Sequence, residues 1–100
     1  MTSQILYMKF GEYIKLLRER NQLVQRQLAS CLDMDTAMLS KIERGERRAK
    51  KEQIPEFAKQ LNVNASELNI IWVADQVYDL IKNEVNASDI LNVVAKKIIV

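Results

Sequence analysis

Residues 25–44 decide the fold, and they read Gln-Arg-Gln-Leu-Ala-Ser-Cys-Leu-Asp-Met-Asp-Thr-Ala-Met-Leu-Ser-Lys-Ile-Glu-Arg. Apolar residues recur in this stretch at helical spacing, which predicts one helix over residues 25–32 and a second over 36–44. Asp35 stands where its carboxylate can accept backbone N–H bonds as the N-cap of the second helix. Gly45 follows that helix, and glycine readily takes the left-handed conformation that ends helices. The turn between the two helices is therefore very short.

Four apolar side chains of this stretch can face a common core. Leu28 and Leu32 lie one turn apart on the first helix, and Leu39 and Ile42 lie three positions apart on the second. Small Ala29 stands where two steeply crossing helices bring their backbones close together. This pattern predicts a helix-turn-helix.

Helical spacing and few helix breakers continue along the rest of the chain. The 100 residues include two glycines and one proline. Pro55 falls in the first turn of a helix predicted over 53–61, where its missing N–H has no intrahelical partner to lose. A further helix is predicted over residues 10–20. The predicted fold class is therefore all-α.

Two similar segments, Asn-Ala-Ser-Glu at 64–67 and Asn-Ala-Ser-Asp at 86–89, are typical of helix starts. Each places an asparagine three positions before an acidic residue, as in a capping pair, with the acid where the helix dipole favours it. They predict a fifth helix that runs to about residue 83 and a sixth over 88–97. Both segments also spell the Asn-X-Ser glycosylation pattern, but without a secretory signal the capping interpretation is favoured.

Composition argues against several classes of protein. Apolar residues make up 48% of the chain, but no run reaches the roughly 18 consecutive apolar residues of a membrane-spanning helix, and the N-terminus lacks a secretory signal. Cys31 is the only cysteine and histidine is absent, which argues against a zinc site and removes the commonest general base. We interpret Cys31 as incidental rather than redox-active. We expect a cytoplasmic protein that is not an enzyme and uses no cofactor, metal, small-molecule ligand or membrane.

The formal net charge of +2 is unevenly distributed. Residues 1–40 carry five Lys/Arg and four Asp/Glu, residues 41–51 carry six and two, and residues 52–100 carry four and seven. The middle segment is therefore +4, between +1 and −3. Such a segment is often a solvated loop, but beside a motif that enters DNA it can also bind phosphates.

Three segments carry a resemblance to a known family: Leu-Val-Gln-Arg-Gln-Leu-Ala at 23–29, Leu-Ser-Lys-Ile-Glu-Arg-Gly at 39–45 and Leu-Asn-Val at 61–63. They resemble the phage-repressor-like (lambda-repressor-like, xenobiotic-response-element) helix-turn-helix regulators, over roughly residues 10–69. The resemblance implies a five-helix DNA-binding domain, to which the sixth helix is an addition. Asp33 replaces a common glycine of the turn, and Val24 replaces a common Ser/Thr cap. Asp tolerates the left-handed region, and losing the cap costs about 1 kcal/mol, so both departures are compatible with the fold.

In that family the helix over 36–44 enters the major groove of DNA with its N-terminus first. The side chains that lie opposite Leu39 and Ile42 and so face the bases are then Thr36, Ala37, Ser40 and Lys41. Thr36 and Ala37 suit thymine methyl groups, and Lys41 suits guanine O6 and N7. Three alternatives stay open: a phosphate contact of Lys41, a Ser40 side chain that faces water, and a Met38 side chain at the rim of the core, which we favour over a contact in the groove.

Phosphate contacts fix a protein on DNA without reading its sequence. Gln25, at the start of the helix over 25–32, resembles the phosphate clamp of the family. The basic segment supplies the other phosphate-contacting candidates: Arg44, Arg47, Arg48, Lys50 and Lys51. In relatives an arginine of the first helix pairs with the glutamate that ends the recognition helix, and here these positions are Arg18 and Glu43. The resemblance therefore implies a structural ion pair, against the alternative of two unrelated surface charges.

The predicted fifth helix carries two apolar stripes. They are Ile70, Val73, Val77 and Leu80, and Ile71, Ala74, Tyr78 and Ile81. One stripe can pack on the core, whereas the other, with the apolar last helix, would leave a patch that monomers rarely expose. We therefore predict a homodimer whose interface contains Trp72, Val73, Val77, Leu80, Leu91, Val94 and Ile98. The alternative is that the last helix covers the fifth within one chain.

These inferences divide the chain into a DNA-binding domain over 1–69 and a helical extension for dimerisation over 70–100. The expected function is that of a repressor-type transcriptional regulator that binds a short palindrome of double-stranded DNA as a homodimer. Phage-type repressors, restriction-modification controllers and antitoxins share the resemblance, and the sequence does not separate them. A protein-interaction module on the same scaffold is the alternative from another class.

Overall fold

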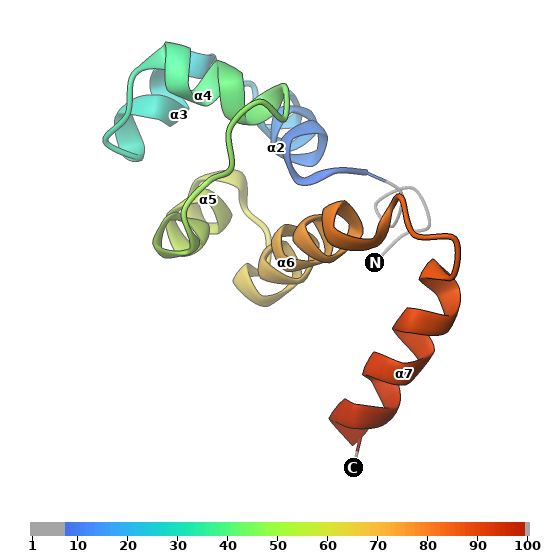
Figure 1. The fold of residues 1–100 in the computed structure, drawn as a ribbon. Coiled ribbons are helices and arrows are strands. Elements are labelled where there is room, and N and C mark those ends of the chain that lie inside the picture. Colours follow the sequence, from blue (N-terminus) through green and yellow to red (C-terminus); the bar gives the residue numbers. More distant parts are fainter. Residues whose placement is uncertain (1–7, 100) are drawn as a thin grey trace.

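A computed structural model describes residues 8–99 of the protein (Figure 1). Within this range the chain forms six α-helices and one 3-10 helix and no strand. The elements are α2 (Phe10–Arg20), α3 (Gln25–Cys31), α4 (Thr36–Glu43), η1 (Lys51–Gln53), α5 (Ile54–Leu61), α6 (Ala65–Ile81) and α7 (Ala87–Ile99). The all-α prediction is confirmed. None of the described helices is both long enough and apolar enough to cross a membrane.

The helix boundaries differ from those predicted by at most two residues. The first helix has the predicted bounds, whereas α3 and α4 each end one residue early, at Cys31 and Glu43. Gln53, predicted as the first residue of a helix, is the last residue of the 3-10 helix η1. Helix α5 begins at the next residue and has Pro55 in its first turn. Helix α6 ends at Ile81, before residue 83, while α7 begins at Ala87 and continues to Ile99, past residue 97.

Four helices, α2 to α5, end in the same hydrogen-bond pattern, in which a left-handed residue reverses the chain; after α5 this residue is Asn62 (φ 58°). After α3, Asp33 has φ 54°, and the Met34 N–H donates to the Ala29 carbonyl oxygen at 3.1 Å. Gly45 (φ 77°) ends α4 and Gln22 (φ 57°) ends α2 in the same way. The left-handed conformation is strained for side chains other than glycine, and Asp is among those that bear it best. The interpretation of Asp33 as a tolerated replacement for glycine is therefore confirmed.

The core lies between α2 through α5 and the first half of α6. Its largest fully buried side chains come from each of these helices: Ile14, Leu28, Leu39, Phe57, Leu61 and Leu68. The rings of Phe10 and Phe57 meet edge to face at 5.8 Å between centroids, a favoured arrangement of two aromatic groups. The four residues predicted to face inward from the helix-turn-helix, Leu28, Leu32, Leu39 and Ile42, are all buried.

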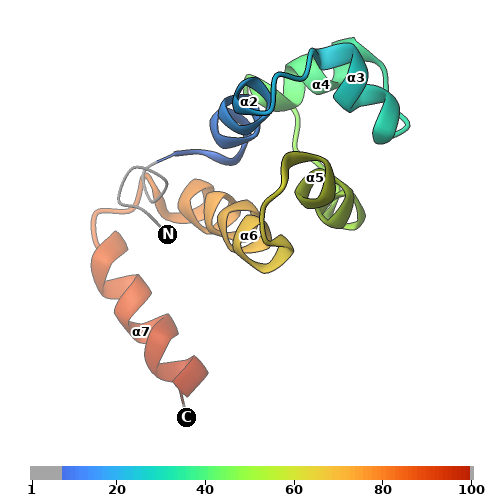
Figure 2. The same ribbon diagram turned by 180° about the vertical axis from the view of Figure 1, so that it is seen from behind.

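Helix α6 belongs to the core at one end and leads out of it at the other. Leu68 and Ile71 are buried against the other helices, and α6 continues unbroken across the division expected between residues 69 and 70. Both views show α7 leaving the end of α6 and extending away from the other helices (Figures 1 and 2). No residue of α7 is buried. The structure therefore contradicts the alternative in which the last helix covers the fifth within one chain.

Gly11 allows α2 and α4 to approach each other closely. A Cβ atom placed on Gly11 would lie 2.3 Å from the carbonyl oxygen of Ile42 and 2.7 Å from that of Glu43. Both contacts are with backbone, which cannot rotate away as a side chain can. The last turn of α4 therefore rests directly on the backbone of α2.

Gly11→Ala should lower the free energy of unfolding by about 1–3 kcal/mol, because the added methyl group forces the two helices apart. The higher helix propensity of alanine, worth about 1 kcal/mol, works against this loss and makes a loss informative. Urea denaturation measures the effect. Lys15→Ala, at an exposed site of the same helix, is the control, and we expect it to stay within about 0.5 kcal/mol of the wild type. Equal stability of the two variants would contradict the close approach.

Candidate nucleic-acid interface

The face of α4 that lies opposite the core is open. Leu39 and Ile42 are 0% and 2% exposed, which fixes the rotation of the helix about its axis. Thr36, Ala37 and Lys41 are exposed on the other side, and the Asp35 carboxylate accepts a bond from the Met38 N–H at 2.8 Å. The predicted N-cap is thus present. The geometry leaves the first turn of α4 and the Lys41 side chain accessible to a partner.

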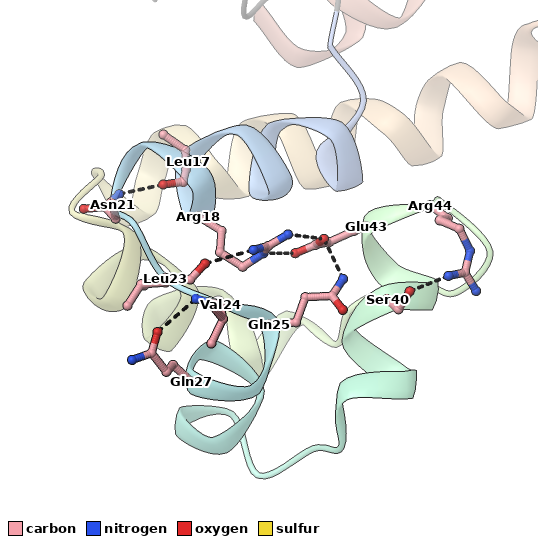
Figure 3. Close-up of polar contacts among 10 residues, drawn as sticks. All are labelled: Leu17, Arg18, Asn21, Leu23, Val24, Gln25, Gln27, Ser40, Glu43 and Arg44. Atoms are coloured by element: carbon pink, nitrogen blue, oxygen red, sulfur yellow. Dashed lines mark hydrogen bonds and ion pairs between the residues drawn. The ribbon is translucent and has the colours of Figure 1, made fainter.

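Two further side chains of α4 are engaged within the chain. Met38 is half-buried and packs against the core, in agreement with the favoured prediction. Ser40 is half-buried, and its hydroxyl oxygen accepts a hydrogen bond from the Arg44 guanidinium (Figure 3). Arg44 also forms an ion pair with Glu46. Sequence reasoning missed this link, which holds Ser40 and Arg44 together at the end of the helix.

A buried polar network holds the end of α4 against α2 and α3. Arg18 forms two hydrogen bonds with the Glu43 carboxylate, 2.7 Å from Nε and 3.1 Å from Nη2, and its Nη1 donates to the Leu23 carbonyl oxygen at 2.9 Å. The side chains of Arg18 and Glu43 are only 11% and 3% exposed, and the charged hydrogen bond raises the pKa of Arg18 further above its usual value. The ion pair implied by the family resemblance is present.

Gln25 also belongs to this network. The sequence did not predict this contact. Its Nε2 donates to Glu43 Oε1 at 3.0 Å, so three helices meet at one carboxylate (Figure 3). The side-chain amide of Gln25, which the sequence predicted to contact a phosphate, thus has a structural partner within the protein. Gln25 remains half-buried at the first residue of α3, and its phosphate contact stays a prediction.

The start of α3 is capped from inside the helix rather than from its N-cap residue. Val24 has no side-chain acceptor, but its N–H donates to Gln27 Oε1 at 2.9 Å. This bond is the half of a capping box that the residue three positions into the helix supplies. The cost of replacing a Ser/Thr cap by Val24 is therefore partly offset by Gln27.

The basic segment after α4 is fastened to α6. The Trp72 indole Nε1–H donates to the carbonyl oxygen of buried Ala49 at 2.8 Å, and Arg48 pairs with Asp79 at 3.5 Å. Trp72, which the sequence predicted for a dimer interface, packs against the core instead of facing outward. Its hydrogen bond fixes the path of the backbone between Arg48 and Lys50.

Some basic side chains of this segment form ion pairs with acidic residues, and others do not. Arg44 and Arg48 have acidic partners, as described above. Lys41, Arg47, Lys50 and Lys51 are exposed and form no ion pair with any residue in the range 8–99. The described structure thus has an open face of α4 and, in the segment that follows it, three exposed cations without an ion pair, the last of which begins η1.

Asp75 links α6 to the start of α2. Its carboxylate accepts a hydrogen bond from the Phe10 N–H at 2.7 Å, in the first turn of α2. Burial raises the pKa of the Asp75 carboxyl, the bond from Phe10 opposes this rise, and the nearby charge of Asp79 adds to it. The Asp75 carboxyl therefore ionises less readily in the folded protein than in the unfolded chain.

In the wild type the stability contributed by Asp75 is present below its unfolded pKa and is lost as the pH rises through its higher folded pKa. Asp75→Asn keeps an oxygen that can accept from Phe10 and has no charge to desolvate. We expect the free energy of unfolding of the variant to rise relative to the wild type between about pH 3.5 and 6.5. Urea denaturation across this range checks it, and a difference independent of pH would contradict it.

Glu43→Gln leaves the buried Arg18 guanidinium without its counter-charge. We expect the free energy of unfolding to fall by roughly 3 kcal/mol, since breaking one side of a buried ion pair leaves an uncompensated charge. The matched control is Glu46→Gln, which removes the same charge from the exposed pair with Arg44 and should cost about 1 kcal/mol or less. Guanidinium denaturation compares them, and similar losses would argue against a structural role for Glu43.

Comparison with known proteins agrees with this geometry. A family model described as a helix-turn-helix domain matches residues 9–69. Among solved structures, the restriction-modification controller protein C.AhdI from Aeromonas hydrophila is similar, with 30% sequence identity and a TM-score of 0.54 over 59% of this chain and 86% of that one. No curated protein sequence matches significantly. The family match covers more than half of the chain, and the protein therefore belongs to the phage-repressor-like helix-turn-helix family of DNA-binding regulators.

Proposed function

We propose that this protein is a cytoplasmic, repressor-type transcriptional regulator that binds a short palindrome of double-stranded DNA as a homodimer. The observation that carries the proposal is the orientation of α4, whose inner side chains Leu39 and Ile42 are buried while Thr36, Ala37 and Lys41 face outward. In this motif the outward side chains at the start of the second helix read base edges in the major groove. The similarity to a restriction-modification controller supports a regulatory role.

The roles of individual residues follow from what each side chain is free to do. Thr36 and Ala37 offer methyl groups to thymine, and Lys41 offers a donor to guanine. Ser40 is assigned to the same surface, where its link to Arg44 orients it toward the end of the helix. The phosphate-contacting set is Gln25, Arg44, Arg47, Arg48, Lys50 and Lys51. A protein that occupies a promoter blocks access of the polymerase, and this is the basis for the repressor assignment.

A dimer supplies specificity that one short helix lacks. One recognition helix contacts too few base pairs to select one site among roughly 10⁶ or more competitors, whereas two helices read two half-sites about one turn of DNA apart. The outward stripe of α6 is available for this pairing, since Val73, Val77 and Leu80 are exposed. We therefore place the interface on α6 and α7, with Val73, Val77, Leu80, Leu91, Val94 and Ile98. Trp72 packs against the core and so holds α6 in place behind this interface.

Binding should depend steeply on salt. Each protomer has four exposed basic side chains without an ion pair in the described range, namely Lys41, Arg47, Lys50 and Lys51. Eight such contacts per dimer, at about −0.9 each, predict a slope near −7 for log K against log salt concentration. Sites are first selected from random duplexes and examined for two-fold symmetry, and fluorescence anisotropy then measures the slope. A flat salt response would favour the protein-interaction module.

Lys41→Ala distinguishes base reading from phosphate contact. If Lys41 reads a base, we expect a loss of about 1–3 kcal/mol that is confined to operators with the preferred base at one position. Uniform weakening on all duplexes would identify a phosphate contact instead. Lys59→Ala, at an exposed site of α5, is the charge-matched control. Affinity unchanged by Lys41→Ala on every duplex would remove Lys41 from the interface.

A further inference from the structure

Helix α7 has an apolar stripe that no other part of the described range, residues 8–99, covers. Ala87, Leu91, Val94 and Ile98 follow one another at intervals of four, three and four residues, which places them on one side of the helix. The opposite side carries polar Asp89, Asn92 and Lys96. No residue of α7 is buried, and Ile98 is 77% exposed. An amphipathic helix of this kind gains stability chiefly by burying its apolar face against a partner.

A second uncovered stripe lies on α6. Ile70, Val73, Val77 and Leu80 follow at intervals of three, four and three residues, and they are 38–80% exposed. Successive residues of a helix turn by about 100°, so this stripe lies on the side opposite Leu68 and Ile71, which face the core. A helix that is apolar on both sides is normally buried on both sides.

The two stripes are complementary in spacing and in length. Both alternate intervals of three and four residues, the pattern that lets two helices pack side chain into gap along a common seam. At about 1.5 Å per residue, the α6 stripe spans roughly 15 Å and the α7 stripe roughly 16 Å. Neither stripe contains a charged residue. Each stripe therefore has the shape and chemistry of the surface that the other requires.

The path of the chain keeps the two stripes of one molecule apart. After Ile81, the Lys82 N–H donates to the Tyr78 carbonyl oxygen at 2.8 Å and the Glu84 N–H to the Ile81 carbonyl oxygen at 2.9 Å. These bonds form the turn from which α7 extends away from α6 (Figures 1 and 2). Within residues 8–99, no segment of the same molecule covers the α6 stripe, which leaves it open to a second molecule.

We propose that two copies of this chain exchange their C-terminal helices, so that α7 of each copy packs on the outward stripe of α6 of the other. This inference rests on the homodimer of the proposed function and specifies how that dimer is held together. A two-fold exchange covers all four stripes of the pair at once and leaves no free end for further association. It also joins the interface to the DNA-facing loop, because Trp72 on the other side of α6 holds Ala49.

The exchange is tested by a disulfide between two different chains, in a Cys31→Ser background that removes the native thiol. One chain carries Val73→Cys or Val77→Cys on α6, and a second, longer tagged chain carries Leu91→Cys on α7. After mixing and oxidation we expect a mixed disulfide with at least one of the α6 positions, and which one forms reports the direction of packing. The control replaces Leu91→Cys by Val93→Cys, which lies on another side of α7. Cross-linking no greater than this control would overturn the proposal.

A single chain that carries both cysteines separates exchange from folding back. A covalent dimer on a non-reducing gel supports exchange, whereas a cross-linked monomer would show that α7 turns back onto its own α6 and would overturn it.

A pair of charge substitutions tests the same seam without cross-linking. Val94→Glu places a carboxylate in the seam twice per dimer and should weaken dimerisation by roughly 100-fold or more, whereas Val93→Glu, outside the seam, should leave it within about threefold. Sedimentation equilibrium of the full chain measures both. A dimer that survives Val94→Glu would overturn the exchange and leave DNA binding by the dimer standing. Failure of the wild-type protein to bind any duplex would instead overturn the proposed function, while the cross-linking result would still stand.

Discussion

The buried ion pair between Arg18 and Glu43 determines where the recognition helix lies. Both charges are removed from water, and each such burial is costly unless the charges satisfy one another with good geometry. Here the Arg18 guanidinium donates to both carboxylate oxygens of Glu43 and, through one further bond, to the Leu23 carbonyl oxygen, while Gln25 donates to the same carboxylate. A network of this kind is satisfied in one arrangement only. Its contribution is to set the position of α4 relative to α2 and α3, more than to add stability.

That constraint matters because α4 is short. Its eight residues form about two turns, and isolated helices of this length are not stable in water. The Asp35 cap and the left-handed Gly45 define where the helix begins and ends, but they do not orient it. Orientation comes from Leu39 and Ile42 in the core, from Glu43 in the polar network, and from the close approach of Gly11. The outward direction of Thr36 and Lys41 is thus imposed by the rest of the domain.

The features that the sequence predicted are those encoded by neighbouring residues. The cap at Asp35 and the inward set of the helix-turn-helix follow from spacing within one or two turns, whereas the role of Asp33 in the turn is implied by the family resemblance. The missed features join residues far apart in the chain: Gly11 with Ile42, Gln25 with Glu43, and Phe10 with Asp75. No local pattern marks these contacts, because each depends on how whole helices cross. The Arg18–Glu43 pair is equally distant, and it was anticipated only through resemblance to a family.

The packing of α6 was also only partly predictable from the sequence, and it affects the basic segment over residues 41–51. Spacing predicts that one stripe can pack on the core, but it gives no sign that Trp72, which belongs to neither stripe, packs there as well. In the structure its indole N–H reaches Ala49, and Asp79 on the same helix pairs with Arg48. Of the six cations in residues 41–51, Arg44 and Arg48 are paired with acidic side chains. Through Trp72 and Asp79, α6 thus holds the loop in place and pairs one of its cations, while Lys41, Arg47, Lys50 and Lys51 have no ion pair in the range 8–99.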